Sequence, residues 1–382
     1  MKEFSVIVVG TGIFGLSSTY NLLRREVGSL ALIEQFSFGH DRGSSHGDTR
    51  MARAVYLNTD YSSLYHTALN EDWKHLEEKS GEQLFYPCPI CLYSSPADLI
   101  NDYAESVIDR VEGISSVSVE SARERFTQII IPDEATVLIE DTSGVLAARS
   151  TIELLKEFCL SYGADLFENT KVLKVEIGSD KVIVETDEET FAARYLVLAL
   201  GAWTSLLLPY TKPILKVIPQ TVGYFKPSNS QHQYSYENFP IWIRLQLKNN
   251  IQDCYYGLPP IKGNLMKVCH EVVEAPTSYD PRTPYDIKSS SLEDLQNLVQ
   301  SNIQNIDWEL DYGEPCFYTL TNSGNFVVDF SPESDRAIVV GGGSGHAFKF
   351  SPLIGRAVAN MLLDGNSGIP AFEKMRHLFK LA

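Results

Sequence analysis

The chain has 382 residues, of which 44% are hydrophobic, so it can form a sizeable core in one large domain or in two. The formal net charge of −17 argues against nucleic acid or an anionic membrane surface as a partner. No apolar run reaches the ~18 residues that a membrane-spanning helix needs. The N-terminus enters a predicted strand almost at once, and the ending Phe379-Lys380-Leu381-Ala382 is not the Ser-Lys-Leu peroxisomal signal. We therefore expect a cytoplasmic protein.

The first 34 residues carry a glycine motif in a strand–helix–strand context. The apolar run Val6–Val9 predicts a buried parallel strand, and Gly10-Thr11-Gly12-Ile13-Phe14-Gly15 opens a segment with one apolar helical face. A second apolar run, Leu30–Ile33, ends in Glu34, whose carboxylate suits a ribose hydroxyl. This order predicts an adenine dinucleotide site, with the phosphates at the helix N-terminus; the alternative is a glycine-rich turn that binds nothing. The residues expected to contact the dinucleotide are Gly10, Gly12, Ile13, Gly15 and Glu34.

The rest of the chain alternates between helical and strand patterns. A polar, glycine-rich stretch spans 39–53, and helices are predicted at 62–79, 96–112, 119–126, 150–162, 292–306 and 351–363. Strands are predicted at 171–175, 181–185, 195–200, 326–330 and 337–340. Between 217 and 273 the alternating, aromatic-rich sequence indicates an antiparallel sheet.

Dinucleotide-fold elements thus occur at the start, the middle and the end of the chain. We predict an α/β fold with an α+β second domain, in which a Rossmann-like domain is interleaved with an antiparallel-sheet substrate domain. The nucleotide domain is expected at 1–80, 150–212 and 320–382, and the substrate domain at 81–149 and 213–319. An NAD-dependent dehydrogenase keeps its nucleotide domain more contiguous, so this plan favours FAD.

Six cysteines are present, and without a secretory signal we expect free thiols. Cys88-Pro89-Ile90-Cys91 has the spacing of a redox or zinc pair, but no second such pair follows and the segment has a strand pattern. We therefore favour two strand cysteines and expect no metal site.

Four further segments resemble one known family. They are 43–50 (GSSHGDTR), 256–268 (YGLP leading to LMKV), 315–319 (PCFYT) and 344–350 (SGHAFKF). In this order, after the glycine motif, the chain resembles the monomeric sarcosine oxidase family, which includes N-methyltryptophan and pipecolate oxidases and, further off, fructosyl amino acid oxidases. The resemblance runs nearly end to end. It implies a monomer that uses FAD to oxidise a secondary or N-substituted α-amino acid, with O2 reduced to H2O2 and the imine product hydrolysed.

The resemblance also implies roles for individual residues. Cys316 matches the cysteine that holds the flavin through a thioether to its 8α-methyl carbon. Arg53 and Lys349 match the residues that bind the substrate carboxylate, and Tyr256 and Tyr318 match positions that line the substrate space. Without the resemblance, the two cations would be read as surface residues, the tyrosines as sheet packing and Cys316 as a core thiol.

Lys267 matches the lysine that activates oxygen, since a fixed cation stabilises the superoxide that forms first. By strand alternation alone, Lys267 would point to solvent. Arg50 and His46 match residues near the flavin ring. Arg50 would favour negative charge on the reduced flavin, and His46 would be the group that gains or loses a proton near neutral pH. The catalytic set implied is Lys267, Arg50, His46 and Tyr318, and the further cofactor contacts implied are Ser45, Thr49, Arg50, Gly201, Trp203, Gly345, His346 and Lys349.

Two departures from the family pattern bear on the substrate. The arginine motif continues as Met51-Ala52-Arg53, where sarcosine oxidases have Ile-Ile-Arg, and Glu271 stands where they have a histidine. On the face of Lys267, Glu271 would repel a small carboxylate or bind an extra amine or hydroxyl group of the substrate. His270 falls on the opposite strand face. Alternatives are a pipecolate- or saccharopine-type oxidase, a fructosyl amino acid oxidase, an NAD-dependent dehydrogenase and a non-catalytic FAD-binding protein.

Overall fold

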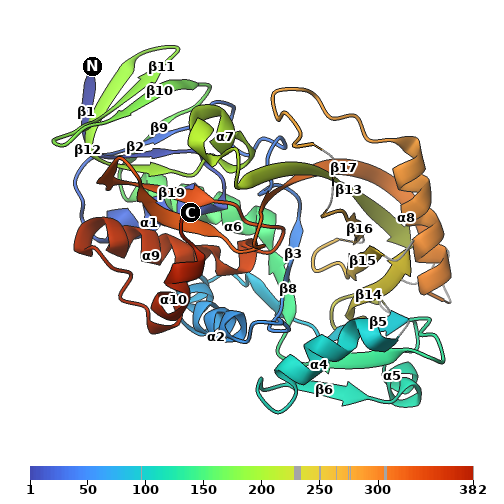
Figure 1. Ribbon diagram of the computed structural model, residues 1–382. Coiled ribbons are helices and arrows are strands. Elements are labelled where there is room, and N and C mark those ends of the chain that lie inside the picture. Colours follow the sequence, from blue (N-terminus) through green and yellow to red (C-terminus); the bar gives the residue numbers. More distant parts are fainter. Residues whose placement is uncertain are drawn as a thin grey trace.

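A computed structural model describes residues 1–95, 97–227, 234–248, 251–263, 265–273, 275, 277–304 and 308–381 (Figure 1). The predicted boundaries at residues 96 and 306 lie outside the described residues, as do parts of the predicted sheet region 217–273. The fold is of mixed α/β type and is built around two large sheets.

The first sheet is the dinucleotide-type sheet. Its path runs β10 (Val172–Ile177), β11 (Val182–Thr186), β12 (Thr190–Leu198), β1 (Lys2–Val9), β2 (Leu30–Ile33) and β9 (Ala164–Phe167), and β19 (Ser334–Gly341) joins β12 and pairs with β18 (Val327–Ser331). β1 is parallel to β2 and to β12, and its last four residues are buried because helices and loops cover both faces. The predicted strand–helix–strand unit is therefore present.

Three helices pack together beside this sheet: α1 (Ile13–Arg24), α6 (Ala148–Ser161) and α9 (Ser351–Asp364) (Figure 1). Gly355 of α9 lies so close to α1 that a Cβ atom there would be 2.4 Å from the carbonyl carbon of Ser17. The chain closes with α10 (Pro370–Met375). Short helical segments follow β12, including α7 (Thr204–Leu207).

The second sheet forms one wall of the site. Its order is β17 (Trp308–Thr321), β13 (Leu215–Pro227), β16 (Met266–Glu271), β15 (Ile251–Leu258), β14 (Ile241–Lys248), β5 (Ile90–Ser95), β7 (Thr136–Glu140) and β6 (Ile114–Val117). Its neighbouring strands are antiparallel except β5 and β14, which run parallel. α8 (Ser289–Asn302) covers one face, on the right of Figure 1, where Met266 and Val268 join its apolar side chains.

A three-stranded sheet and a long helical segment complete the structure. The strands are β3 (Thr49–Ala52), β8 (Gly144–Ala147) and β4 (Phe85–Pro87). The predicted helix at 62–79 is present as α2 (Asp60–Thr67), a π-helical turn at Ala68–Trp73 and α3 (Lys74–Ser80). The region from 97 to 125 contains a 3-10 turn (Ala97–Ile100), α4 (Asn101–Val107) and α5 (Val119–Arg125).

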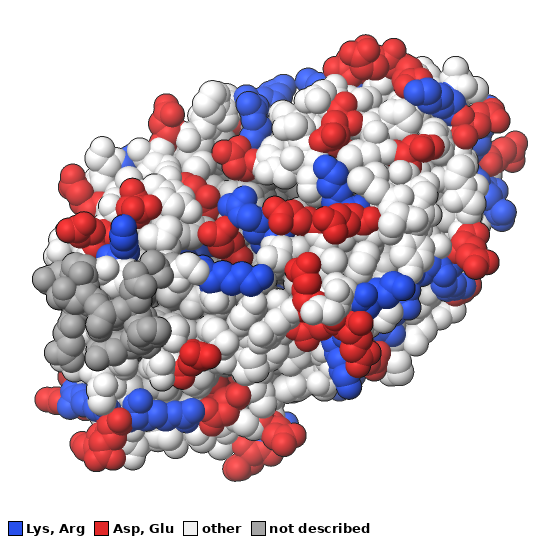
Figure 2. All heavy atoms as spheres, turned by 180° about the vertical axis from the view of Figure 1, so that it is seen from behind, with Lys and Arg blue, Asp and Glu red and all other residues white. Residues whose placement is uncertain are grey.

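The strands of the two large sheets come from the segments predicted for the two domains, although β17 ends at Thr321, two residues beyond the predicted boundary at 319. The division into two domains itself stays a prediction. On the face shown in Figure 2, Lys and Arg side chains lie among Asp and Glu side chains rather than in one broad basic patch. Within the described residues, no helix is both long enough and apolar enough to cross a bilayer.

All six cysteines are free thiols. Cys88 and Cys91 are both buried, and burial raises the pKa of each thiol to about 12. The Cys88 thiol donates to the Phe239 carbonyl at 3.3 Å. A reactive or metal-binding thiol needs an accessible thiolate, so these two cysteines are structural.

Candidate functional site

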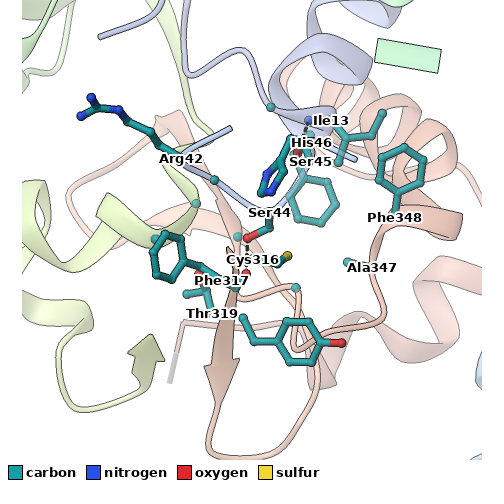
Figure 3. Close-up of a pocket in the computed structure, with 18 of the residues that line it drawn as sticks. Ile13, Arg42, Ser44, Ser45, His46, Cys316, Phe317, Thr319, Ala347 and Phe348 are labelled. Carbon is teal, nitrogen blue, oxygen red and sulfur yellow. Dashed lines mark hydrogen bonds between the residues drawn. The ribbon is translucent and has the colours of Figure 1, made fainter. Parts of the chain in front are cut away.

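A cavity of about 1220 Å³ lies between the first sheet and the uncovered face of the second. Its lining comes from the glycine motif, the 42–53 segment, strands β13 to β17 and the 341–349 loop. Figure 3 shows Ser44, Ser45 and His46 facing Cys316 and Thr319 across this space, whereas Arg42 points away from them. Segments far apart in sequence therefore build one site.

The glycine motif forms a cradle at the end of β1. Gly10 has φ +102°, and a Cβ atom there would lie 2.3 Å from the Ala199 carbonyl oxygen. A Cβ atom at Gly15 would lie 1.8 Å from the Gly10 oxygen, so only glycine allows α1 to begin this close to the strand. Gly12 caps α1 without a side chain, and the Ser45 hydroxyl accepts from the Ile13 N–H at 3.0 Å.

Glu34 lies at the end of β2, beside the glycine motif. Its carboxylate accepts from the Thr11 N–H at 3.0 Å, the Thr11 hydroxyl at 2.9 Å and the Phe36 N–H at 3.0 Å. Although burial opposes ionisation, contacts with His40 and these backbone groups hold the pKa of Glu34 below its usual value. An ionised acceptor at this place suits the ribose hydroxyls of a dinucleotide. Gly201 and Trp203 line the same part of the cavity, and the Trp203 ring contacts the Phe36 ring edge-on.

Arg50 and Lys267 form a cationic cluster around the Thr49 carbonyl. Arg50 Nη1 donates to this oxygen at 2.7 Å, and Lys267 Nζ donates to it at 3.2 Å. Arg50 Nη2 also donates to the Ser44 oxygen at 2.8 Å, which fixes the 44–50 loop. Lys267 is only 6% exposed, so the expectation of a solvent-facing strand lysine is wrong. Burial and the Arg50 guanidinium lower the pKa of Lys267 to about 8.

His46 presents an unpaired nitrogen to the cavity region. Its Nε2–H donates to the Pro315 carbonyl at 2.8 Å, which leaves Nδ1 as a buried acceptor with no partner among the described residues. Burial and the nearby Arg50 guanidinium lower the pKa of His46, so the ring is neutral at neutral pH. The Thr319 hydroxyl is likewise buried and unpaired. These two unpaired groups, together with the glycine cradle, fit a bound cofactor with polar edges, as expected for FAD.

Cys316 lies on β17, and its sulfur points into the space between the 44–46 loop and the 347–348 segment (Figure 3). Two residues along the same strand, Tyr318 meets Tyr256 of β15, and their hydroxyl groups are hydrogen-bonded at 3.3 Å. Burial raises the pKa of both phenols well above the usual value, so both are neutral. Gly345 packs against the Tyr318 ring.

Arg53 and Lys349 converge on Tyr56. Lys349 Nζ donates to the Tyr56 hydroxyl at 2.8 Å, and the Arg53 guanidinium lies 4.5 Å from the Tyr56 ring centroid. Both cations line the cavity. Burial and the Arg53 charge lower the pKa of Lys349 well below its usual value. An anionic ligand here would meet two cationic side chains at once.

His346 lies beside Tyr56 and forms a hydrogen bond with it. Its Nε2–H donates to the Gly324 carbonyl at 3.0 Å, and Nδ1 accepts from the Tyr56 hydroxyl at 3.2 Å. Burial and the Lys349 charge lower the pKa of His346 to about 3. The His346 backbone N–H is already bonded to the Gly343 carbonyl within the loop. In this structure His346 therefore orients Tyr56 through its side chain, and its backbone carbonyl accepts from Lys349 Nζ at 2.9 Å.

Three residues beside the cations did not stand out in the sequence. The first is Tyr56, three positions after Arg53. The second, Glu140 at the end of β7, is fully buried and accepts from the backbone N–H groups of Ala54 at 2.6 Å and Val55 at 3.1 Å. The third, Trp73 in the π-helical turn, donates its indole N–H to the Lys349 carbonyl at 2.7 Å. Each of these three residues contacts a segment that the fold brings close to it, so no local motif in the sequence identifies it.

Glu271 and His270 lie on opposite faces of β16, as strand alternation predicts. Glu271 lines the cavity together with Lys267 and Cys269. His270 instead bonds to Asp253 and stacks on the Tyr255 ring with centroids 4.3 Å apart. The structure therefore brings into one cavity all the residues that the resemblance singles out except Thr49, whose carbonyl bonds to two of them, and leaves His270 outside it.

Comparison with known proteins identifies relatives of the chain. The sequence profile of the family described as FAD dependent oxidoreductase matches residues 5–361. Monomeric sarcosine oxidase of Bacillus sp. (strain B-0618) is 27% identical over 373 residues, which cover 96% of this chain and 93% of that protein. N-methyl-L-tryptophan oxidase of Yersinia pestis (strain Pestoides F) is 25% identical over 371 residues, which cover 96% and 97%.

Among solved structures, the open form of NikD, an unusual amino acid oxidase essential for nikkomycin biosynthesis, is similar with a TM-score of 0.84. The match covers 98% of this chain and 97% of that chain at 20% sequence identity. This similarity shows the fold and confirms the predicted α/β fold class.

Proposed function

Because the chain belongs to the FAD dependent oxidoreductase family, we propose that it is an oxidase of secondary or N-substituted α-amino acids. One observation carries this proposal. Arg53 and Lys349 flank Tyr56 in the same cavity as the glycine cradle and Cys316. The relatives named sarcosine oxidase and N-methyl-L-tryptophan oxidase support the substrate class.

The cation pair binds the substrate carboxylate. A guanidinium fork and an ammonium are the groups that suit a carboxylate, and both are desolvated here. Tyr56 contacts both Arg53 and Lys349, and neutral His346 accepts a hydrogen bond from the Tyr56 hydroxyl, so that the phenol oxygen can accept from Lys349. The Tyr256–Tyr318 pair bounds the substrate space on the second sheet.

The cofactor is FAD, which sets aside an NAD-dependent dehydrogenase. When bound, FAD would supply the redox chemistry: a hydride equivalent would leave the carbon beside the amine nitrogen, and two electrons would go on to O2 to give H2O2. The glycine cradle, Glu34, Ser45, Thr49, Gly201, Trp203 and the 345–349 loop would hold it, and the Cys316 thiol would bond to its 8α-methyl carbon.

Three side chains serve the oxygen reaction and the amine chemistry. The Lys267 ammonium stabilises the anion that forms when O2 gains its first electron, and Arg50 adds a second positive charge nearby. His46 remains neutral and offers Nδ1 as a hydrogen-bond acceptor for a donor in the cavity.

A peroxide-coupled screen tests the proposal. Purified protein should be yellow and release H2O2 with members of a panel of N-methyl, cyclic and other N-substituted α-amino acids. Arg53→Met should raise KM and weaken inhibition by simple carboxylates by about ten- to hundredfold, since a charge-assisted contact contributes roughly 1.5–3 kcal/mol. Arg110→Met, at an exposed site, is the control. If no panel member forms peroxide or bleaches the flavin without oxygen, the substrate class is wrong.

We also propose the interleaved two-domain division, a monomeric state and a cytoplasmic location. The arrangement of strands in the two large sheets supports the first. Size-exclusion chromatography with light scattering tests the second, and cell fractionation tests the third.

A further inference from the structure

Glu271 is a half-buried carboxylate that lines the cavity. It lies at the end of β16, on the cavity face. Within the described residues, no Lys, Arg or His nitrogen forms an ion pair with it, and its hydrogen-bond partner is the thiol of Cys254, the residue opposite it on β15. A thiol is a weak donor, so most of the hydrogen-bonding capacity of this carboxylate is unused by the protein.

Two buried carboxylates near the cavity are satisfied differently. Glu34 accepts three hydrogen bonds from Thr11 and Phe36, and Glu140 accepts two from backbone N–H groups. Among the residues that the structure describes, Glu271 has no comparable donor, and desolvation raises its pKa. A buried charge is costly unless a partner compensates it. This difference indicates that the partner of Glu271 enters from the cavity.

The same cavity carries the complementary charge. Arg53 and Lys349 also line it, and the fields of both reach Glu271. The phenols of Tyr256 and Tyr318 lie close enough to Glu271 for its charge to raise their pKa values. A ligand that bridges these groups must present an anion to the two cations and a donor to Glu271.

We propose that Glu271 is a specificity-determining residue that binds a positively charged N–H group of the substrate, in the cavity that also holds the carboxylate clamp formed by Arg53 and Lys349. This inference rests on the proposed function and narrows its substrate class to ligands that carry both charges in the bound state. The charged nitrogen has two possible sources: the amine attached to the α-carbon, or a second amine in the side chain.

Two pairs of ligands separate these sources. 2-Aminoisobutyrate and pivalate have the same shape, and differ by an ammonium in place of a methyl group at the α-carbon. 5-Aminopentanoate and hexanoate differ in the same way at the end of the chain. Neither 2-aminoisobutyrate nor pivalate has a hydrogen on the α-carbon that oxidation could remove. Dissociation constants are measured on the holoenzyme, without oxygen, from changes in the flavin absorbance.

In the wild type, one pair should show tighter binding of its ammonium member, and that pair identifies the source. In Glu271→Gln this preference should fall about ten- to hundredfold, as for a lost charge-assisted hydrogen bond. The methyl member should bind as tightly as before or more tightly, because a negative charge has left the cavity. Loss of packing alone would weaken both members of a pair. Glu309→Gln, an exposed glutamate on the same sheet, is the control.

The inference is overturned if both preferences are the same in Glu271→Gln as in the wild type, or if the wild type shows neither. Glu271→Asp, which keeps the charge, should retain the preference and serves if the glutamine variant loses its flavin. If neither pair perturbs the flavin of the wild type, the proposed carboxylate site fails and the inference fails with it. If both pairs bind but Glu271 has no influence on the ratio, only the inference fails.

Discussion

Lys267 carries a buried charge whose proposed role belongs to only one half of the catalytic cycle. Its ammonium lies 3.2 Å from the Thr49 oxygen beside Arg50. We expect Lys267→Met to slow flavin reoxidation by O2 by orders of magnitude, because each ~1.4 kcal/mol of lost transition-state stabilisation costs tenfold. Anaerobic reduction by substrate should change far less. Stopped-flow absorbance of the flavin measures both steps.

The control is Lys226→Met, which removes an exposed lysine from β13 of the same sheet. It should leave both steps as in the wild type. If Lys267→Met impairs reduction and spares reoxidation, Lys267 binds substrate and the oxygen role is wrong. If neither step changes, this buried ammonium has no part in either half-reaction.

The pH dependence of reoxidation follows from the same residue. The lowered pKa of about 8 means that Lys267 is a cation below pH 8 and loses its charge as the pH rises through that value. The rate of reoxidation should therefore be constant from pH 6 to 7 and should fall above pH 8. In Lys267→Arg, which stays charged, the fall should disappear, and a fall that persists would assign the titration to another group.

Cys316 can be tested independently of turnover. If its thiol holds the flavin, acid precipitation of the wild type should leave the yellow colour with the protein, whereas Cys316→Ser should release it. Cys269→Ser is a matched control, since Cys269 is a second buried thiol on the cavity wall. Acid-stable flavin in Cys316→Ser would rule out attachment at this residue.

At the scale of elements, Glu140 at the end of β7 bears on both the stability of the fold and the carboxylate clamp, because it bonds to the backbone that follows Arg53. Burial raises the pKa of Glu140 to about 7, even though two backbone N–H groups and nearby cations favour its charge. The folded state thus binds this proton more tightly than the unfolded state. The stability that the protonated group contributes is fully present below about pH 4.5 and is lost as the pH rises through 7.

Replacement of Glu140 isolates this contribution. The free energy of unfolding of the wild type, relative to Glu140→Gln, should fall by about 3 kcal/mol between pH 4.5 and 7.5, since one pKa unit corresponds to ~1.36 kcal/mol. Urea unfolding at the two pH values measures it. An equal difference between the two proteins at both pH values would contradict the raised pKa. The variant should also raise KM, because one backbone N–H beside Arg53 loses its acceptor.

Elements were predictable from sequence where one local pattern decides them. The run Val6–Val9 and the glycines after it define β1 and the start of α1, and the periodicity of 150–162 defines α6. The polar stretch 39–53 contains the short strand β3, which no local pattern marks, because it forms by pairing with residues of β8 that follow it by 92 to 98 positions. The π-helical turn at Ala68–Trp73 leaves the helical pattern around it intact, so the sequence gives no sign of it. β17 contains Gly313 and Pro315, and only its long pairing with β13 makes this segment a strand.

The residues of the candidate site were likewise predictable only where a pattern in the sequence marks them. The glycine motif and Glu34 follow from physical reasoning on the residues alone. Arg53, Lys267, Cys316 and Lys349 could be identified only through the resemblance. Lys267 is an example, because a lysine in an alternating strand is ordinarily exposed. Neither physical reasoning on the sequence nor the resemblance identified Tyr56, Glu140 and Trp73. Their contacts are hydrogen bonds between segments that are distant in sequence.

For the whole molecule, the cavity lies between two sheets whose strands come from every part of the chain. Its lining includes Gly10 and Glu34 near one end of the sequence and His346 and Lys349 near the other. A cofactor that contacts both walls should stabilise both sheets together, because binding to the folded state alone adds RT ln(1 + [L]/Kd) to the free energy of unfolding. At a hundredfold excess over Kd this amounts to about 2.7 kcal/mol.

We expect flavin-free Cys316→Ser protein to gain thermal stability when FAD is added, whereas NADH at the same concentration should have no effect. Amide hydrogen exchange with and without FAD locates the gain. Protection should increase at the ends of β1 and β2, which adjoin the glycine cradle, and also along β16 and β17, which carry Lys267 and Cys316. Protection confined to the first sheet would mean that the cofactor does not reach the second. Lys267 and Cys316 would then lie outside its contacts, and both roles proposed for them would fall together.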